Sequence, residues 1–468
     1  MSTETRPHPP SVERILSIIR GERQEIDEFE VSEAEALTSL TRSVIDEERR
    51  RLAAGAPPTG EGDIAQAVVD RLEELDDPML TIPPHVINAT GVILHTNLGR
   101  SPWPRAARLA ATVAAGSYGY LELDEVTGRR GPRFRAAEDH LVALTGAEDA
   151  LVVTNNAAAL ALAVGLAGRR GAVIVSRGEL VEIGGGVRIP EIVARAGIRL
   201  IEVGTTNRTR AGDFDEPLAT GRAKVVLRVH PSNFAISGFT ESADLGAVAA
   251  MAHEHGAIVI DDLGSGALLD TSAFGLVHEP TPAERLALGA DLVLFSGDKL
   301  IGGPQAGLIV GRRDLIARLR RDPFARAVRP DKAIIAGVAA TLAIYLAGRA
   351  VLDIPVWQLI ALDAETLRTR AEWIRGLATG AAGQTDVSVV EVGSPVGGGS
   401  LPGQVLRSFG VSVRVASPSR SAAALRAGPN RILARIVDDA IVFDLRTVPR
   451  FHDGTIARRI GELGAPQP

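Results

Sequence analysis

The sequence predicts an α/β protein whose core is a mostly parallel sheet of seven strands. From about residue 150 onward, short β-branched runs alternate with alanine-rich helical stretches. Such alternation is typical of a parallel sheet that is covered by helices on both faces. The composition agrees, because 45% hydrophobic and 23% charged residues are values of a globular protein. At 468 residues the chain has room for about two to three domains.

The seven predicted strands are short β-branched runs. They span residues 150–153, 172–175, 199–203, 224–229, 257–260, 292–295 and 308–310. The first six are far enough apart in the chain for crossover helices, so we expect them to be parallel. The connection before the seventh run has only about a dozen residues, among them Gly302, Gly303 and Pro304. It is too short for a helical crossover, and we therefore expect the last strand to run antiparallel.

We expect three domains, which span residues 1–85, 86–345 and 346–468. The first shows helical periodicity that is broken by the linker-like segment AGAPPTGEG. The second holds the predicted sheet. The third is interpreted as a smaller α/β domain, because a helical stretch near 361–377 precedes strand-like runs at 387–392, 411–415 and 441–445.

Features of the whole chain exclude several classes of protein. There is no cysteine, which excludes disulfides, cysteine metal ligands and cysteine nucleophiles. No apolar run reaches the roughly 18 residues of a membrane span, and the first ten residues lack an apolar signal-peptide region, so we expect a cytoplasmic protein without a membrane partner. The net charge of −6 does not indicate a DNA partner. This charge is uneven, since residues 1–80 hold nineteen acidic and nine basic side chains.

One lysine is a candidate catalytic residue. Only three of the 51 basic residues are lysines, and a lysine, unlike an arginine, can lose its proton and form a Schiff base. Lys299 follows the predicted strand at 292–295 in the glycine-rich segment FSGDKLIGGPQ, and Ser296 in that segment can donate to a phosphate. The alternative is a surface lysine in a hairpin loop. The serine, the strand and the rarity of lysine favour the catalytic interpretation.

Two further segments carry candidate site residues. Asp261 and Asp262 end a predicted buried strand, where a carboxylate can keep a heterocyclic nitrogen protonated; the alternatives are a helix cap or a metal ligand. Asn155, Asn156 and Ala157 lie where a strand turns into a helix, whose free N–H groups form an anion site. Taken alone, this turn is better explained as plain helix capping. Together with the lysine, the two segments match the needs of pyridoxal phosphate, which are a phosphate cradle, a partner for the ring nitrogen and an amine for the aldehyde.

Longer motifs carry a resemblance to a known family. They are INATGVILHTNLGR at 87–100, RRGPR at 129–133, RGE at 177–179, EVGTTN at 202–207, HPSN at 230–233, DLGSG at 262–266, SGDK at 296–299 and GSLP at 399–402. On these motifs the chain resembles the bacterial selenocysteine synthases, the L-seryl-tRNA(Sec) selenium transferases, over essentially its whole length. The resemblance implies a fold-type-I pyridoxal-phosphate-dependent transferase with a small N-terminal helical domain, assembled as a ring-shaped homodecamer, a pentamer of dimers.

The resemblance also implies an activity and roles for residues. The activity is conversion of L-seryl-tRNA(Sec) to L-selenocysteinyl-tRNA(Sec) with selenophosphate, through an aminoacrylyl-tRNA bound to pyridoxal 5'-phosphate. Lys299 is implied to carry the cofactor and remove the α-proton, Asp262 to face the ring nitrogen, and Asp298 to support catalysis. The implied cofactor-binding residues are Lys299, Ser296, Asn155, Asn156, Ala157, Asp262, His230 and Ser232. The implied selenophosphate-binding residues are Arg100, Arg133, Arg326 and Arg329, and no metal is implied.

One feature departs from the family, and other functions stay open. The family binds tRNA through its N-terminal domain, whereas residues 1–80 are net acidic here and have one basic cluster, Arg49-Arg50-Arg51. The alternative function is a pyridoxal-phosphate lyase that acts on a small amino acid or amino sugar. Such a relative is expected to lack the N-terminal helical domain and the arginine of HTNLGR, and both are present. A third function, non-catalytic tRNA binding, disagrees with the presence of Lys299 and Asp262.

Overall fold

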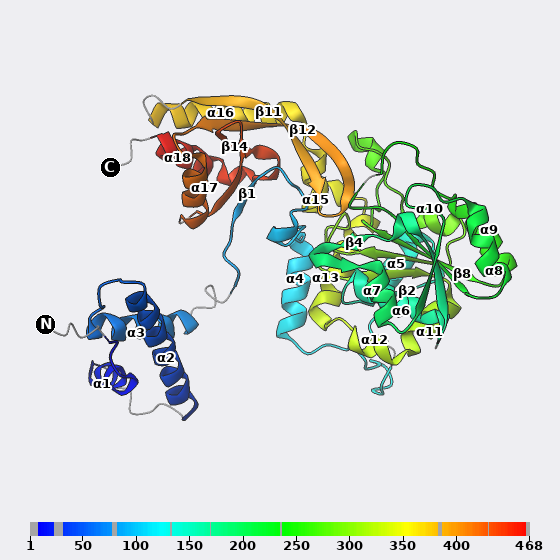
Figure 1. The fold of residues 1–468 in the computed structure, drawn as a ribbon, viewed down its shortest axis with the longest axis horizontal. Coiled ribbons are helices and arrows are strands. Elements are labelled where there is room, and N and C mark those ends of the chain that lie inside the picture. Colours follow the sequence, from blue (N-terminus) through cyan, green and yellow to red (C-terminus); the bar gives the residue numbers. More distant parts are fainter. Residues whose placement is uncertain are drawn as a thin grey trace, which may run out of the picture. The chain divides into compact units, whose positions relative to one another are not determined.

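The computed structural model describes residues 8–22, 31–76, 82–131, 133–168, 170–234, 236–381, 386–428 and 430–464 (Figure 1). The chain divides into two compact units, Met1–Val86 and Ile87–Pro468. Within the described ranges, no helix combines the length and the apolar character that a bilayer crossing requires.

The first unit is helical, as predicted. Its helices are α1 (Val12–Glu22), α2 (Val31–Ala53) and α3 (Glu61–Asp76). Buried aliphatic side chains from all three helices, such as Ile15, Ile45 and Val68, form its core. Ile15 and Ile19 are four residues apart and both buried, so α1 presents one apolar stripe to that core.

The second unit contains the predicted seven-stranded sheet. Its strands are β2 (Asp149–Val153), β3 (Ala172–Ser176), β6 (Arg199–Val203), β7 (Val225–Val229), β8 (Ile258–Gly264), β9 (Leu292–Ser296) and β10 (Gly307–Gly311). Their order across the sheet is β2-β10-β9-β8-β7-β3-β6. β10 pairs antiparallel with both β2 and β9, and the other pairs are parallel. All seven predicted runs and the antiparallel seventh strand are therefore confirmed.

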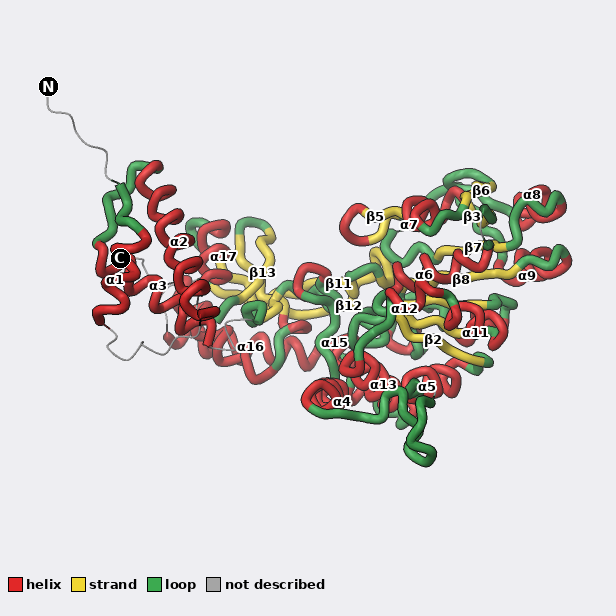
Figure 2. Tube along the Cα trace, turned by 90° about the horizontal axis from the view of Figure 1, so that it is seen from below, coloured by secondary structure: helices red, strands yellow, loops and turns green. Residues whose placement is uncertain are grey.

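Helices cover both faces of this sheet (Figures 1 and 2). Neighbouring strand residues point to opposite faces, so Val152 packs into the core on one side and Val153 into the core on the other. The first core includes side chains of α5 (Ala136–Thr145), α9 (Leu245–Glu254) and α13 (Lys332–Leu346). The second includes side chains of α6 (Asn156–Val164), α7 (Ile189–Arg195) and α11 (Arg313–Arg321). Burial on both faces explains why most of these strands are continuous apolar runs in the sequence.

A second sheet forms the C-terminal part of this unit. Its strands are β1 (Ile87–Ala89), β11 (Val387–Gly397), β12 (Ser400–Arg414), β13 (Ile432–Val437) and β14 (Ala440–Asp444), in the order β1-β13-β14-β12-β11. Side chains of α16 (Ala364–Ala381), α17 (Pro418–Ala427) and α18 (Asp453–Gly464) complete its core. The three predicted runs lie in β11, β12 and β14. β1 and β13, which pair in parallel, were not predicted. The three-domain division stays a prediction.

The β11–β12 hairpin extends from this second sheet toward the seven-stranded sheet (Figure 2). Its tip contains Gly397, Gly398 and Gly399, which all have a left-handed φ. A Cβ at Gly398 would lie 2.5 Å from the carbonyl oxygen of Leu94. Only glycine therefore lets this tip approach the neighbouring loop so closely.

Candidate functional site

A cavity of about 470 Å³ lies at the carboxyl ends of the parallel strands, where ligands bind in such sheets. We call it the Lys299 cavity. Residues at the ends of β8 and β9, and just after β2 and β7, line it. It brings together most of the residues predicted from the sequence, namely Arg100, Asn155, Asn156, Ala157, His230, Ser232, Asp262, Ser296 and Lys299.

Lys299 has its amine at this cavity rather than in a surface hairpin. Nζ donates a hydrogen bond to the Gly399 carbonyl oxygen at 3.2 Å. Burial lowers the pKa of the Lys299 amine, and the positive charge of Arg100 lowers it further, while nearby carboxylates act in the opposite direction. The lowered pKa favours the neutral amine, which is the form that attacks an aldehyde or accepts a proton.

Asp262 is the aspartate of β8 that faces the Lys299 cavity. Its Oδ1 accepts hydrogen bonds from Asn156 Nδ2 at 2.7 Å and from the Gly264 N–H at 3.1 Å. Burial raises the pKa of the Asp262 carboxyl to about 6, although the Asn156 hydrogen bond opposes this shift. Asp261 points to the opposite face of the strand, where it pairs with Arg285. Of the two aspartates, only Asp262 lines this cavity, so Asp262 is the one placed to face a ring nitrogen there.

The start of α6 lies at the same cavity. Asn155 Oδ1 accepts a hydrogen bond from the Ala158 N–H at 2.9 Å, so this residue caps the helix, as the alternative interpretation expected. All three residues of the predicted turn nevertheless line the cavity, together with Ser232 and Ser296. The first N–H groups of a helix have no partner within it, and with two hydroxyl groups they form a donor set that suits a phosphate.

Two glycines leave room around the lysine amine. Gly264 and Gly399 have φ values of 66° and 78°. A Cβ at Gly264 would lie 2.9 Å from Ser232 Oγ, and a Cβ at Gly399 would lie 3.1 Å from Lys299 Nζ. A side chain at either position would crowd Ser232 or the lysine amine, next to which the ring of a bound cofactor would lie. The amine, the buried carboxylate, the helix start and this open space together fit pyridoxal phosphate.

Arg100 reaches the Lys299 cavity from a strained backbone position. Its φ of 63° is in the left-handed region, which residues other than glycine rarely adopt. Arg100 Nη1 donates to Asp298 Oδ2 at 2.6 Å. Asp298 is buried and does not line the cavity itself. Asp298, which precedes Lys299 in the sequence, therefore binds the guanidinium of Arg100 and holds it near the lysine amine.

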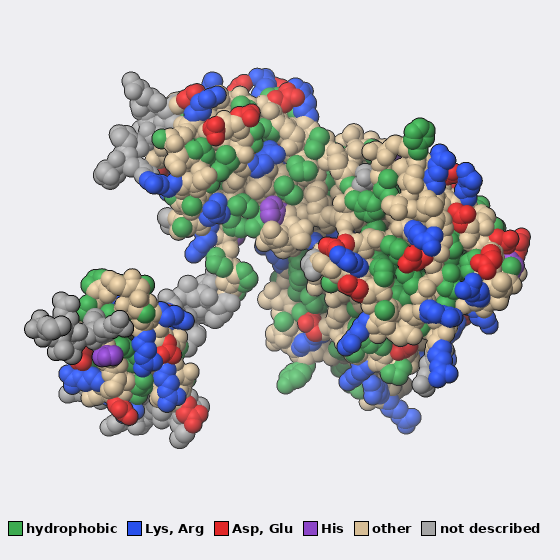
Figure 3. Space-filling view, viewed as in Figure 1, with side chains coloured by type: hydrophobic (Ala, Val, Ile, Leu, Met, Phe, Trp, Pro, Cys, Tyr) green, Lys and Arg blue, Asp and Glu red, His purple; other side chains and the backbone are tan. Residues whose placement is uncertain are grey.

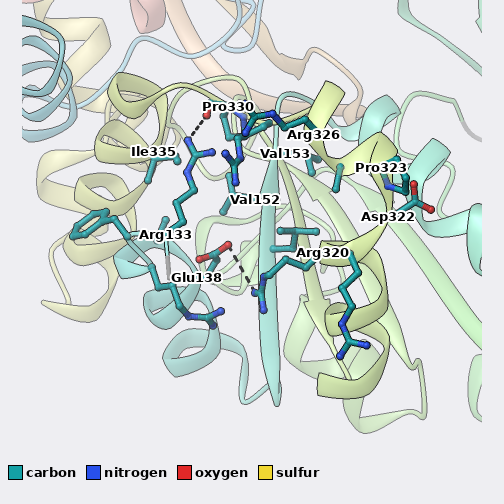
Figure 4. Close-up of a pocket in the computed structure, with 17 residues that line it drawn as sticks. Arg133, Glu138, Val152, Val153, Arg320, Asp322, Pro323, Arg326, Pro330 and Ile335 are labelled. Carbon is teal, nitrogen blue, oxygen red and sulfur yellow. Dashed lines mark hydrogen bonds and ion pairs between the residues drawn. The ribbon is translucent and has the colours of Figure 1, made fainter. Parts of the chain in front are cut away.

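The other three predicted arginines line a second cavity, of about 490 Å³ (Figure 4). We call it the arginine cavity, since its lining includes Arg133, Arg135, Arg320, Arg321, Arg326 and Arg329. Arg100 is not part of it, so the chain does not bring the four predicted arginines into one cavity. The two cavities are neighbours across the end of β2, because Val153 lines the arginine cavity and Asn155 the Lys299 cavity. Between them, the Thr154 N–H donates to the Val328 carbonyl oxygen at 2.9 Å.

A buried hydrogen-bond network holds the segment that follows Lys299. The Tyr345 hydroxyl donates to the carbonyl oxygens of Leu300 at 3.0 Å and Ile301 at 2.9 Å, and accepts from Trp357 Nε1 at 2.6 Å. Burial raises the pKa of Tyr345, so its hydroxyl stays a donor. This network fixes the backbone just after the lysine.

Tyr345→Phe is expected to lower the free energy of unfolding by about 1–3 kcal/mol, because it leaves the Trp357 N–H and two buried carbonyl groups without their partner. Denaturant unfolding of the purified protein measures the effect. Trp373→Phe is the control, since Trp373 is exposed on α16 and its indole N–H can bond to water instead. Equal losses in the two variants would show that the network does not stabilise this segment.

Several cavity residues were not predicted individually. Thr96 and Gln305 line the Lys299 cavity, and they lie in the motifs HTNLGR and FSGDKLIGGPQ. Gly398 also lines it. Its only signal in the sequence is the run of three glycines at 397–399, because its place at the cavity depends on the β11–β12 hairpin.

Comparisons with known sequences agree on one family, and a comparison with solved structures supports the fold. A family model described as "SelA: L-seryl-tRNA selenium transferase" matches residues 86–449. The L-seryl-tRNA(Sec) selenium transferase of Moorella thermoacetica is 43% identical over 430 residues, which cover 90% of each chain. That of Carboxydothermus hydrogenoformans is 42% identical and covers 88% of this chain and 89% of its own. A solved structure of D-glucosaminate-6-phosphate ammonia-lyase is similar in fold, with a TM-score of 0.57, 21% identity, and coverage of 82% of this chain and 96% of that chain.

Proposed function

Because this chain belongs to the L-seryl-tRNA selenium transferase family, we propose that the Lys299 cavity is its active site. The chain converts L-seryl-tRNA(Sec) to L-selenocysteinyl-tRNA(Sec), with selenophosphate as the selenium donor and pyridoxal 5'-phosphate as the cofactor. The observation that carries the assignment of the site is the meeting of Lys299, Asp262 and the start of α6 in one cavity. These are the groups that hold the aldehyde, the ring nitrogen and the phosphate of this cofactor.

Each of these groups has a task that follows from its surroundings. The bound cofactor supplies an electron sink that makes the α-proton of the seryl group acidic. Lys299, whose pKa is lowered by burial, provides a neutral amine that attaches the cofactor and then accepts that proton. Asp262, fixed by Asn156, places a negative charge opposite the ring N–H. Ser232, Ser296 and the helix start bind the phosphate.

The arginines are proposed to bind the selenium donor. Selenophosphate is a small, highly charged oxyanion, and guanidinium groups bind oxyanions with two parallel hydrogen bonds. Arg133, Arg326 and Arg329 gather in the arginine cavity next to the active site, while Arg100 stands inside it. This arrangement supports anion binding by Arg133, Arg326 and Arg329 in the arginine cavity and by Arg100 in the Lys299 cavity.

Arg329→Ala is expected to raise the selenophosphate concentration needed for half-maximal rate by about a hundredfold, because a bidentate anion contact is lost. The visible absorbance of the bound cofactor stays normal, since Arg329 is outside the Lys299 cavity. The assay follows selenium incorporation into Ser-tRNA(Sec) across a donor titration. Arg313→Ala, an exposed change on α11 away from both cavities, is the control. A wild-type donor response in Arg329→Ala would remove this residue from the donor site.

The first unit is proposed to contribute to tRNA binding. Its arginines are partly neutralised, because Arg49 pairs with Asp46 at 2.5 Å and Arg51 with Glu48 at 2.5 Å. Figure 3 shows acidic and basic side chains interspersed on the visible face of this unit. With −10 in residues 1–80 and −6 in the whole chain, residues 81–468 carry +4. These charges support recognition of tRNA shape by the first unit, with phosphate attraction supplied by the second.

Assembly as a homodecamer, a pentamer of dimers, is also part of the proposal. Large apolar side chains stay exposed in the single chain at Tyr118, Tyr120 and Val126, and on α4 (Arg105–Gly116) at Leu109 and Val113. Leu109 and Val113 are four residues apart and so share one face of the helix. Exposed apolar side chains gathered in this way support an interface between copies of the chain.

The aminoacyl-tRNA substrate places the proposed reaction in the cytoplasm.

The lyase alternative is not favoured. The lyase structure shares 21% identity and so supports the fold alone, whereas the transferases are 42–43% identical over nearly the whole chain. The deciding assay supplies the purified protein with Ser-tRNA(Sec) and selenophosphate and measures selenium on the tRNA. Selenium transfer is the expected result. Elimination from a small amino acid without any transfer to tRNA would make the chain a lyase.

A further inference from the structure

The arginine cavity contains a carboxyl group that the proposed function does not use. Two acidic residues, Glu138 and Asp322, line this cavity. Asp322 Oδ1 accepts a hydrogen bond from the Phe324 N–H at 2.8 Å and so caps α12 (Pro323–Ala327). The Glu138 carboxyl group makes no hydrogen bond to any residue that the structure describes. Its Oε1 lies 4.0 Å from Arg320 Nη2, an ion-pair contact without a hydrogen bond (Figure 4).

The charges around Glu138 do not compensate for its burial. Its side chain is only 14% exposed. Arg320 and Arg135 are the cations that lower its pKa most, but both already bind Asp149, at 3.1 and 2.6 Å. Arg133 also interacts electrostatically with Glu138. The negative charges of Asp149 and Asp139 raise this pKa further. Burial therefore raises the pKa of the Glu138 carboxyl to about 7, the two arginines offsetting only part of this shift.

Among the other cations of the cavity, Arg329 pairs with Glu122 at 2.6 Å, whereas Arg133 has an unused donor. Arg133 Nη2 donates to the Pro330 carbonyl oxygen at 2.5 Å, but its buried Nε has no partner among the described residues. Burial lowers the pKa of Arg133, and the positive charge of Arg329 lowers it further. Arg326 acts in the same direction, while the negative charges of Glu122 and Glu138 oppose it. Such a cluster is stabilised by a bound anion, and Glu138 stands at its edge.

We propose that Glu138 is protonated when the cavity is filled and donates a hydrogen bond to the oxyanion that Arg133, Arg326 and Arg329 bind, so that the anion and one proton bind together. The inference rests on the proposed function of this cavity as the donor site. An ionised Glu138 repels a phosphate-type dianion, whereas the neutral carboxyl offers it one more donor. Glu138 is then a substrate-binding residue, and affinity for the donor falls as the pH rises through neutrality.

The test measures sulfate binding to the full-length holoenzyme by calorimetry at pH 6 and pH 8. Sulfate is a tetrahedral dianion whose own charge does not change in this range. The wild type is expected to bind about tenfold more weakly at pH 8, because a carboxyl with a pKa near 7 is mostly protonated at pH 6 and mostly ionised at pH 8. Glu138→Gln, which is neutral and keeps a donor, is expected to bind equally at both pH values.

Two controls separate the possible failures. Glu216→Gln makes the same chemical change at an exposed position on α8 (Asp215–Ala219), which does not line the cavity, and is expected to keep the tenfold dependence. Arg326→Ala tests the cavity itself. If Arg326→Ala binds sulfate like the wild type, the donor-site proposal fails. If Arg326→Ala loses sulfate but Glu138→Gln keeps the tenfold dependence, only the role of Glu138 is overturned. Should Glu138→Gln not fold, Glu138→Leu gives the same comparison, with pH-independent but weaker binding expected.

Discussion

Lys299→Ala is expected to abolish the visible absorbance of the purified protein and to reduce selenium transfer by at least about a thousandfold. The variant loses both the amine that holds the cofactor aldehyde and the base that accepts the α-proton, and a positioned base alone contributes about 10²–10⁴ in rate. The Lys299 amine is the group around which Gly264 and Gly399 leave space. Absorbance spectra and single-turnover assays with Ser-tRNA(Sec) measure the two losses.

The chain offers matched controls for this prediction. Lys332 Nζ donates to the Ser117 carbonyl oxygen at 2.6 Å and does not line the Lys299 cavity. Lys332→Ala and Lys224→Ala are therefore expected to keep the absorbance. Borohydride reduction followed by peptide mapping should label Lys299 alone. A label on Lys224 or Lys332 would contradict the assignment of the site.

Asp262→Asn is expected to retain the cofactor but to lower turnover by about 10²–10⁴-fold. The carboxamide has the same shape as the carboxylate, and its oxygen can still accept the hydrogen bond from Asn156, so the structure of the cavity is kept. It lacks the negative charge that keeps the ring nitrogen protonated, and an unprotonated ring is a weak electron sink. Turnover with Ser-tRNA(Sec), compared with the amount of bound cofactor, separates the two effects.

Asp261→Asn is the control for Asp262→Asn, because it makes the same chemical change at the adjacent residue. Asp261 faces Arg285 on the other side of β8 and is fully buried. Its loss leaves a largely buried guanidinium unpaired, which costs about 3–5 kcal/mol of stability. We expect a lower midpoint of unfolding with near-normal turnover per folded molecule. The reverse pattern, with Asp261→Asn inactive and Asp262→Asn active, would exchange the two roles.

The fold of the second unit was predictable because its strands are buried on both faces. Burial makes most of them short apolar runs, and the spacing of the runs shows which connections can hold a helix. The connection from β9 to β10 is too short and too rich in glycine for a crossover, which predicted the antiparallel β10. The strand ends then meet at one edge of the sheet. That geometry is why Lys299, Asp262 and Asn155, far apart in the chain, were expected in one site.

The sequence by itself therefore determined the sheet, the direction of its strands and the residue types at their carboxyl ends, since these depend on local periodicity and on the length of connections. Only the tertiary structure decided which aspartate faces the lysine, because strand alternation allows either and the position of Arg285 selects one. The tertiary structure also decided that β1 pairs with β13 and that the Gly399 carbonyl contacts Lys299. It likewise decided that Arg100 lies outside the arginine cavity. Each of these features depends on how segments distant in the chain are placed relative to one another. That placement is set by how whole helices and strands pack, and not by any pattern within one segment.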